Sequence, residues 1–182
     1  RAGRRGKARE RPVITVQARL MKGLVTGAKG QLGNDLVTQL EAAGFTAVSF
    51  SSAELDISDL AAVLEAVKKA KPGIIINPAA YTKVDLAEKE KDRAYAVNAL
   101  GAENLALAAK EANCPIVHVS TDFVFDGRSP VPCVEEAQTN PLSVYGASKL
   151  AGEKSVAAAT DAHVIVRTSW LYGSGGSGGN FV

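Results

Sequence analysis

The chain has 182 residues, of which 46% are hydrophobic and 22% are charged, and its formal net charge is +2. This composition is typical of a globular domain with its own core, and no apolar run approaches the ~20 residues that cross a bilayer, so we expect no membrane partner. Two cysteines occur, Cys114 and Cys133, without a CxxC pair. They argue against a disulfide framework and favour a reducing, cytoplasmic compartment. Both histidines lie in apolar strand-like runs, and no metal site is predicted.

Positive charge is concentrated at the N-terminus. Residues 1–20 carry seven Lys or Arg and one Glu, whereas the remaining 162 residues carry 14 bases and 18 acids. Such an arm could bind nucleic acid. However, Met21 and Lys22 directly precede the first predicted strand and resemble a natural start. We therefore interpret residues 1–20 as translated upstream sequence or a dispensable basic extension, and expect no nucleic-acid partner.

From residue 22 onward, short β-rich runs alternate with longer helical patterns. In chain order we predict a strand at 23–26, a helix at 31–43, a strand at 46–50, a helix at 58–69, a strand at 74–76, a long Ala-rich helical stretch at 87–112 that could break early, a strand at 116–120, a polar loop at 125–141, a helix at 143–160 and a strand at 163–167. Gly44 is predicted to end the first helix and Ser58 to cap the second. Strands without strict alternation, separated by helices, indicate an α/β fold with a Rossmann-type, doubly wound parallel sheet.

The first strand–helix junction carries three glycines at a spacing of three, in the run TGAKGQLG at 26–33. In such a turn Gly27 permits the tight bend, Gly30 lets the backbone approach a pyrophosphate, and Gly33 allows close packing of helix on strand. The N-terminus of the helix supplies N–H donors and positive potential. Because the glycines lie between a strand and a helix in the first βα unit, they predict a dinucleotide site.

The end of the second strand bears on which nicotinamide cofactor is bound. An acidic residue there would bind the ribose 2′-hydroxyl of NAD. The sequence instead has Phe50, Ser51 and Ser52, and Glu54 and Asp56 come slightly too late. Lys29 could reach a 2′-phosphate and Ser51 could donate a hydrogen bond to it. We therefore favour NADP(H), with NAD(H) as the alternative.

A candidate catalytic pair lies early in the helix predicted at 143–160. Tyr145 and Lys149 are four residues apart and so share one helix face. A nearby ammonium favours the phenolate and shifts the tyrosine pKa toward neutrality, which suits proton transfer. Thr121 follows the strand at 116–120, at the sheet edge where open α/β sheets bind ligands. Its hydroxyl could bond a carbonyl oxygen that gains charge during reaction.

At these residues the chain resembles a known family. The runs TGAKGQLG, NPAAYT, VNALGAENLA, STDFVFDG, NPLSVYGASKLAGE and RTSWLYG are similar to the extended short-chain dehydrogenase/reductase superfamily, and within it to the dTDP-4-dehydrorhamnose reductases. The resemblance covers residues 21–182. It implies NADPH-dependent reduction of the C4 ketone of a nucleotide sugar, dTDP-4-dehydrorhamnose, to dTDP-L-rhamnose. Tyr145 would protonate the oxygen, Lys149 would hold the nicotinamide ribose, and Thr121 would bind the sugar oxygen.

The resemblance also assigns roles to further positions. It implies that the cofactor is bound by Gly30, Gln31 and Leu32 at the pyrophosphate, by Asp56 and Ile57 at the adenine, and by Ala80, Tyr81 and Thr82 after the third strand. Asp122 and Trp170 match positions near the sugar, although a turn cap and a core residue explain them as well. Asn98 matches a helix asparagine that supports the active site by backbone bonding, although polar packing inside the helix explains it about as well.

The resemblance also bears on domain organisation. We assign residues 21–182 to an NAD(P)-binding Rossmann domain. The glycine-rich run at 173–179 precedes the C-terminus by only three residues, which we interpret as truncation before most of the substrate-binding part. The 182 residues are therefore expected to bind NADP(H) but to turn over sugar nucleotide poorly.

Three alternatives stay open. A sugar-nucleotide epimerase or a dehydratase would share the cofactor cradle and the three catalytic residues, although Asp122 is not followed by the Glu expected of a dehydratase. A non-catalytic NADP-binding subunit, similar to the regulatory subunit of methionine adenosyltransferase, is the third. A homodimer is a further possibility.

Overall fold

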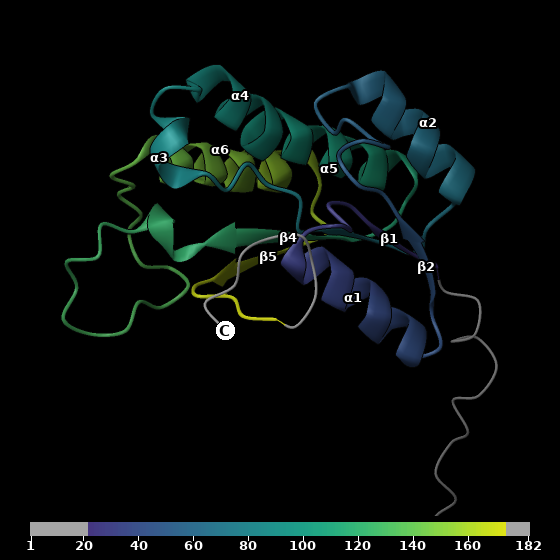
Figure 1. The fold of residues 1–182 in the computed structure, drawn as a ribbon, viewed down its shortest axis with the longest axis horizontal. Coiled ribbons are helices and arrows are strands. Elements are labelled where there is room, and N and C mark those ends of the chain that lie inside the picture. Colours follow the sequence, from purple (N-terminus) through teal and green to yellow (C-terminus); the bar gives the residue numbers. More distant parts are fainter. Residues whose placement is uncertain (1–21, 174–182) are drawn as a thin grey trace, which may run out of the picture.

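The computed structural model describes residues 22–173, which form a five-stranded parallel sheet with helices on both faces (Figure 1). The elements are β1 (Lys22–Val25), α1 (Gln31–Ala42), β2 (Thr46–Ser49), α2 (Leu60–Ala70), β3 (Ile74–Asn77), α3 (Val84–Ala87), α4 (Lys91–Tyr95), the π-helix η2 (Ala96–Leu100), α5 (Gly101–Glu111), β4 (Ile116–Thr121), the 3₁₀-helix η3 (Asp122–Val124), α6 (Val144–Ala159) and β5 (His163–Thr168). The predicted α/β class with a Rossmann-type parallel sheet is confirmed. The basic extension at 1–20 and nearly all of the glycine-rich run at 173–179 lie outside the described residues.

The strand order β2-β1-β3-β4-β5 positions the ligand site. The chain first builds outward from β1 to β2 and then returns to add β3 on the other side of β1. The connections on either side of β1 therefore leave the sheet in opposite directions, and open α/β sheets bind ligands in the crevice at this point, beyond the carboxyl ends of the strands. The glycine turn after β1 lies at that point.

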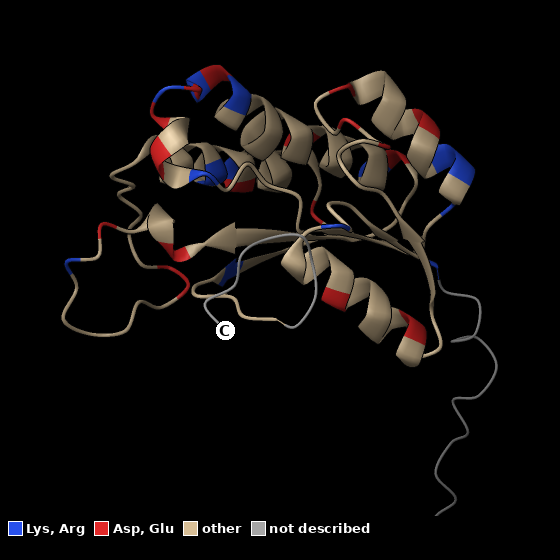
Figure 2. Ribbon diagram, in the orientation of Figure 1, with Lys and Arg blue, Asp and Glu red and all other residues tan. Residues whose placement is uncertain are grey.

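The core lies between the sheet and a layer of helices. Figure 1 shows α2, α5 and α6 on one face of the sheet and α1 on the other. Leu24, Ile75 and Ile116, one from each of three adjacent strands, are fully buried and pack in one cluster with Val63 and Leu105 from the helices. The central strands β3 and β4 carry no Lys, Arg, Asp or Glu, and the charged residues lie mainly on helices and loops (Figure 2). This charge distribution is what burial on both faces of a strand requires.

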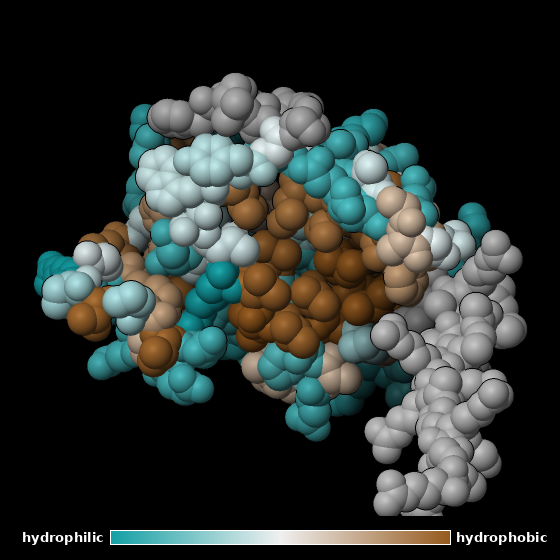
Figure 3. Space-filling view, turned by 90° about the horizontal axis from the view of Figure 1, so that it is seen from below, coloured by the Kyte–Doolittle hydropathy of each residue, from teal (hydrophilic) through white to brown (hydrophobic). Residues whose placement is uncertain are grey.

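The face of the sheet that carries α1 is less well covered. Val164 and Val166 of β5 are 54% and 39% exposed. Figure 3 shows this side of the molecule, where hydrophobic residues gather at the centre of the surface. Among residues 22–173, no helix is long and apolar enough to cross a membrane, and no cluster of three or more His, Cys, Asp or Glu could hold a metal ion.

Two local predictions need correction and one holds. Asp59, not Ser58, caps α2, because its carboxylate accepts from the backbone N–H groups of Ala61 and Ala62. Ser58 instead donates its hydroxyl to Asp56. The helical stretch predicted at 87–112 does break early, at 88–90, but it also contains the π-helix η2, which was not predicted. Gly44 does end the first helix, with a φ of 85° that favours glycine.

Candidate active site

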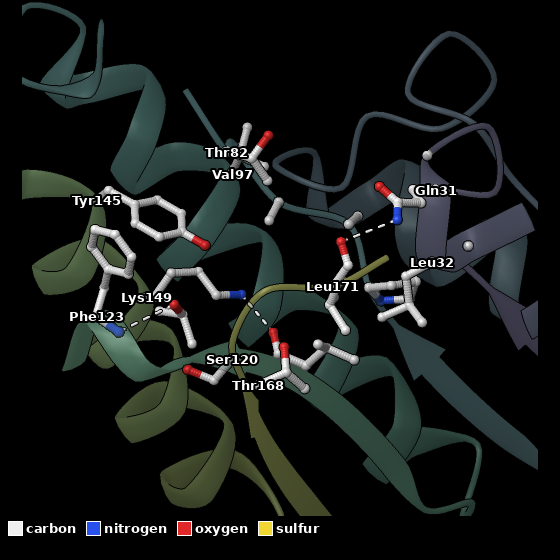
Figure 4. Close-up of a pocket in the computed structure, with 18 of the residues that line it drawn as sticks. Gln31, Leu32, Thr82, Val97, Ser120, Phe123, Tyr145, Lys149, Thr168 and Leu171 are labelled. Atoms are coloured by element: carbon white, nitrogen blue, oxygen red, sulfur yellow. Dashed lines mark hydrogen bonds between the residues drawn. The ribbon is translucent and has the colours of Figure 1, made fainter. Parts of the chain in front are cut away.

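One cavity of about 750 Å³ runs along the carboxyl edge of the sheet, from the glycine turn after β1 to the N-terminal half of α6. Figure 4 shows Gln31 and Leu32 at one end and Tyr145 and Lys149 at the other, with Thr168 and Leu171 between them. Most of the predicted site residues line it: Gly27, Lys29, Gly30, Gln31, Leu32, Gly33, Asp56, Ile57, Ala80, Thr82, Thr121, Asp122, Tyr145, Lys149 and Trp170.

The glycine turn is shaped by backbone contacts that side chains would block. Gly27 has a φ of 59°, and a Cβ there would lie 2.9 Å from the Cα of Ala79. A Cβ on Gly33 would collide with the carbonyl oxygen of Gly27. The helix α1 begins directly after this turn, and its N-cap Gly30 offers no side-chain hydrogen bond to the first N–H groups. An uncapped helix N-terminus against an open cavity fits a pyrophosphate.

Two predicted cofactor residues do not line the cavity. Ser51 is buried, and both its N–H and its hydroxyl donate to Oε2 of Glu54, at 2.8 and 2.6 Å. Tyr81 packs in a small hydrophobic cluster with Ala87 and Ala94. Its hydroxyl donates to Glu90 at 2.9 Å. The side chains of Ser51 and Tyr81 are therefore engaged within the protein.

Several wall residues were missed by the sequence analysis. Ser52, not Ser51, lines the cavity at the end of β2. The others are mostly small or apolar residues that carry no chemical signature: Leu55, Pro78, Ala79, Val84, Val97, Val119, Ser120, Phe123, Thr168, Ser169 and Leu171. Pro78, Ala79, Thr168 and Ser169 lie directly after predicted strands, which was the available signal for them. Val84 and Val97 lie in helical segments and carried no such signal.

The helix α6 brings Tyr145 and Lys149 to the cavity. Ser143 caps this helix by accepting from the N–H of Gly146. The carboxylate of Glu88, from the segment after α3, accepts from the N–H of Val144 at 2.8 Å. Both contacts fix the first turn of α6, which carries Tyr145. In Figure 4 the tyrosine hydroxyl points into the cavity above the Lys149 side chain.

Lys149 is almost fully buried and donates from Nζ to the carbonyl oxygen of Val119 at 2.7 Å. Burial lowers the pKa of this lysine from 10.5 to about 8, although Glu153 opposes the shift. The pKa of Tyr145 is raised by burial, while the Thr121 hydroxyl lowers it and Asp122 raises it further. This is opposite to the direction expected from the neighbouring ammonium, because desolvation of the phenol dominates.

Thr121 ends β4 at the floor of the cavity. Its hydroxyl donates to Asp122 at 3.1 Å and accepts from the N–H of Phe123 at 3.2 Å. The Phe123 ring packs edge-on against Tyr145, with 5.5 Å between ring centroids. Asp122 thus orients the threonine hydroxyl as well as beginning η3. Thr121 and Tyr145 both line the cavity.

Behind the site, Asn98 connects the segment after β3 to α6. Its side chain accepts from the N–H of Tyr81 at 2.8 Å, and its amide donates to the Tyr81 carbonyl at 3.1 Å and to Ser148 at 2.9 Å. Ser148 donates in turn to the carbonyl of Tyr145. Asn98 lies in the π-helix η2. It therefore supports the helix that carries Tyr145, as the resemblance implies.

A second buried network was not predicted. The carboxylate of Glu153 accepts from Ser120 Oγ at 2.5 Å and from Arg167 at 3.0 Å through Nε and 2.7 Å through Nη2. Arg167 also donates to the carbonyl of Glu135. Glu153 lies one helical turn after Lys149, which was the available sequence signal. Its partners come from β4 and β5 and could not be assigned without the fold.

The segment after β5 borders the other side of the cavity. Trp170 is 73% exposed and has a φ of 50°, so it is not a core residue. The carbonyl of Leu171 accepts from Nε2 of Gln31 at 3.1 Å. Residues after the fifth strand thereby contact the glycine turn, and Trp170 lies at the cavity mouth.

Comparisons with known proteins agree with this geometry. Residues 21–182 match the family model described as RmlD substrate binding domain. The spore coat polysaccharide biosynthesis protein SpsK of Bacillus subtilis is 42% identical over 90% of this chain and 57% of its own length. A dTDP-4-dehydrorhamnose reductase of Sinorhizobium fredii is 44% identical over 89% of this chain and 54% of its own.

The solved structures include a dTDP-4-dehydrorhamnose reductase from Bacillus anthracis in complex with NADP. It is 44% identical with a TM-score of 0.84, over 88% of this chain and 57% of that one. The chain thus spans somewhat more than half the length of the relatives it matches. Because the family model covers the whole fold and the site, the chain belongs to the family of the RmlD substrate binding domain.

Proposed function

We propose that the chain carries the cofactor cradle and the catalytic residues of an NADPH-dependent enzyme that reduces dTDP-4-dehydrorhamnose to dTDP-L-rhamnose. The observation that carries this proposal is one continuous cavity that joins the glycine turn to Thr121, Tyr145 and Lys149. Relatives at 44% and 43% identity are dTDP-4-dehydrorhamnose reductases, and a structural neighbour holds NADP. These likenesses support the substrate and the cofactor.

The residues of the chain have distinct tasks in this reaction. NADPH, when bound, would supply a hydride for the sugar carbonyl carbon. The N-terminus of α1 and the glycine turn would hold its pyrophosphate, and Asp56 and Ile57 lie along the cavity wall where the adenine is expected. Tyr145 Oη gives its proton to the carbonyl oxygen, while the Thr121 hydroxyl turns away from Asp122 and donates its hydrogen bond to that oxygen. Lys149, held by the Val119 carbonyl, supplies positive charge below the phenol.

The alternatives are judged by the same residues. A dehydratase would place a Glu after Asp122, whereas the residue there is Phe123, packed on Tyr145. A purely regulatory subunit would have no need of all three catalytic side chains. Their common cavity therefore supports an enzyme, and the relatives named as dTDP-4-dehydrorhamnose reductases favour a reductase over an epimerase.

The test separates binding from chemistry. Binding of NADPH to this chain is followed by the fluorescence of the reduced nicotinamide. Turnover is measured as NADPH consumption with dTDP-4-dehydrorhamnose, on this chain and on the chain joined to the C-terminal part of the Bacillus subtilis relative. Tyr145→Phe is the matched variant, expected to keep NADPH binding and to lose at least 100-fold in turnover, since general acid catalysis contributes about 10²- to 10⁴-fold. Unchanged turnover in Tyr145→Phe would remove Tyr145 from the mechanism.

We further propose that the enzyme acts in the cytoplasm, which the free thiols of Cys114 and Cys133 support. Assembly as a homodimer is proposed as well. Sedimentation of the chain at several concentrations tests the dimer.

A further inference from the structure

A carboxylate stands at the end of β2, although no acidic residue ends that strand. Glu54 folds back onto Ser51, whose N–H and hydroxyl both donate to Glu54 Oε2, at 2.8 and 2.6 Å. The N–H of Leu55 also bonds to the Ser51 carbonyl, so residues 51–55 form a compact turn. The hydrogen bonds from Ser51 lower the pKa of Glu54, which is therefore ionised at neutral pH. By its position in the sequence, Glu54 comes too far after β2 to contact a ribose at the end of that strand. The turn, however, brings its carboxylate back to the strand end.

This carboxylate lies beside the cavity. Its chain neighbours Ser52 and Leu55 both line the cavity, as does Lys29 of the glycine turn. The charge of Lys29 also lowers the pKa of Glu54, although less than the hydrogen bonds from Ser51 do. The β2 strand is anchored to the same turn, since Ala28 N–H donates to the Phe50 carbonyl at 3.0 Å. Lys29 therefore lines the end of the cavity next to β2, and the turn that carries Glu54 borders that end through Ser52 and Leu55.

In dinucleotide-binding sheets, the group at the end of the second strand meets the adenosine ribose. A carboxylate accepts a hydrogen bond from a 2′-hydroxyl and repels a 2′-phosphate, whereas a lysine attracts the phosphate. We propose that Glu54 is a specificity-determining residue that opposes Lys29 and narrows the preference for NADPH over NADH. This inference rests on the proposed function, because it concerns the cofactor of that site.

The experiment compares the affinities of NADPH and NADH for this chain by fluorescence titration. Glu54→Gln keeps a side-chain oxygen that can accept from Ser51 and removes the charge. Glu65→Gln, on the exposed face of α2, is the matched control with the same loss of charge. Glu54→Gln should bind NADPH roughly fivefold more tightly while its affinity for NADH stays equal or falls, as expected for one charge pair in a solvent-accessible site. Glu65→Gln should bind both like wild type.

Salt dependence separates a charge effect from a change in the turn. The gain of Glu54→Gln for NADPH should shrink as ionic strength rises, because exposed charges are screened. An equal change in both affinities, an unchanged ratio, or a salt-independent change would overturn the inference while leaving dinucleotide binding intact. If the wild type binds neither dinucleotide, the result contradicts the proposed function itself, and with it the inference about Glu54.

Discussion

Replacing Lys149 with Met should stabilise the folded chain at neutral pH. The lysine is 1% exposed, and burial lowers its pKa from 10.5 to about 8. That difference corresponds to about 3 kcal/mol of destabilisation at pH 7. Methionine is flexible and of similar length, so it can fill the same space. The variant loses the hydrogen bond to the Val119 carbonyl, which lines the cavity and can bind water instead. A net gain of about 1 to 3 kcal/mol follows.

The sign of the pH dependence is fixed by the same pKa values. Between about pH 8 and pH 10.5 the unfolded chain keeps the Lys149 proton that the folded chain has lost. The free energy of unfolding of the wild type therefore rises with pH in this window, relative to Lys149→Met. The advantage of the variant should be complete near neutrality and should vanish by about pH 10.5.

Urea unfolding of the two proteins, at several pH values from about 7 to 10, measures this difference directly. Lys154→Met is the control, since Lys154 lies on the same helix but is exposed. Its unfolding free energy should stay within about 0.5 kcal/mol of wild type at each pH. If Lys149→Met were less stable than the wild type at neutral pH, by an amount independent of pH, burial would not destabilise the charged form of Lys149. Turnover should be lost in Lys149→Met, so that stability is gained at the expense of the site.

Two further predictions concern packing and buried charge. Gly33→Ala should abolish measurable NADPH binding, because its Cβ would collide with the Gly27 carbonyl. The control Gly44→Ala should lose about 1 to 2 kcal/mol of stability, because an alanine is strained at the φ of 85° found there. It should still bind NADPH normally in the same titration. His118 is fully buried, and burial followed by the charge of Lys149 lowers its pKa from 6.5 to about 3. Between about pH 6.5 and 3 the unfolded chain binds a proton at this histidine and the folded chain does not. The free energy of unfolding of the wild type should therefore fall from about pH 7 to about pH 4.5 by more than that of His118→Gln. Urea unfolding at the two pH values measures both. Parallel acid profiles of the two proteins would contradict the second prediction.

The features predicted correctly from the sequence depend on neighbouring residues or on a regular pattern of apolar residues. The glycine turn could be located because Gly27, Gly30 and Gly33 lie between a strand and a helix, and their steric roles depend only on neighbouring backbone. The five strands were found because buried strands such as Ile74–Asn77 are short apolar runs between breaks in the chain. The sheet then brings Thr121 to the helix of Tyr145, as the strand–helix alternation indicated.

Predictions failed where a side chain had two competing partners. Ser51 was expected to face a phosphate, but its hydroxyl bonds to the carboxylate three residues later. The spacing Ser51-x-x-Glu54 is that of a capping box and was a signal for this contact. The pKa of Tyr145 was judged from its neighbour Lys149 alone, whereas desolvation depends on everything that surrounds the phenol. Burial of this kind is a property of the assembled fold.

The position of Lys149 in the site depends on the sheet more than on its loops. Two successive residues of β4 hold two successive turns of α6: the Val119 carbonyl accepts from Lys149, and Ser120 donates to Glu153. Arg167 of β5 then pairs with Glu153 and compensates its buried charge. The glycine turn follows β1, which is separated from β4 only by β3. Both ends of the cavity are thus mounted on strands of one hydrogen-bonded sheet, so the distance between the dinucleotide cradle and the catalytic helix is fixed by contacts within residues 22–173.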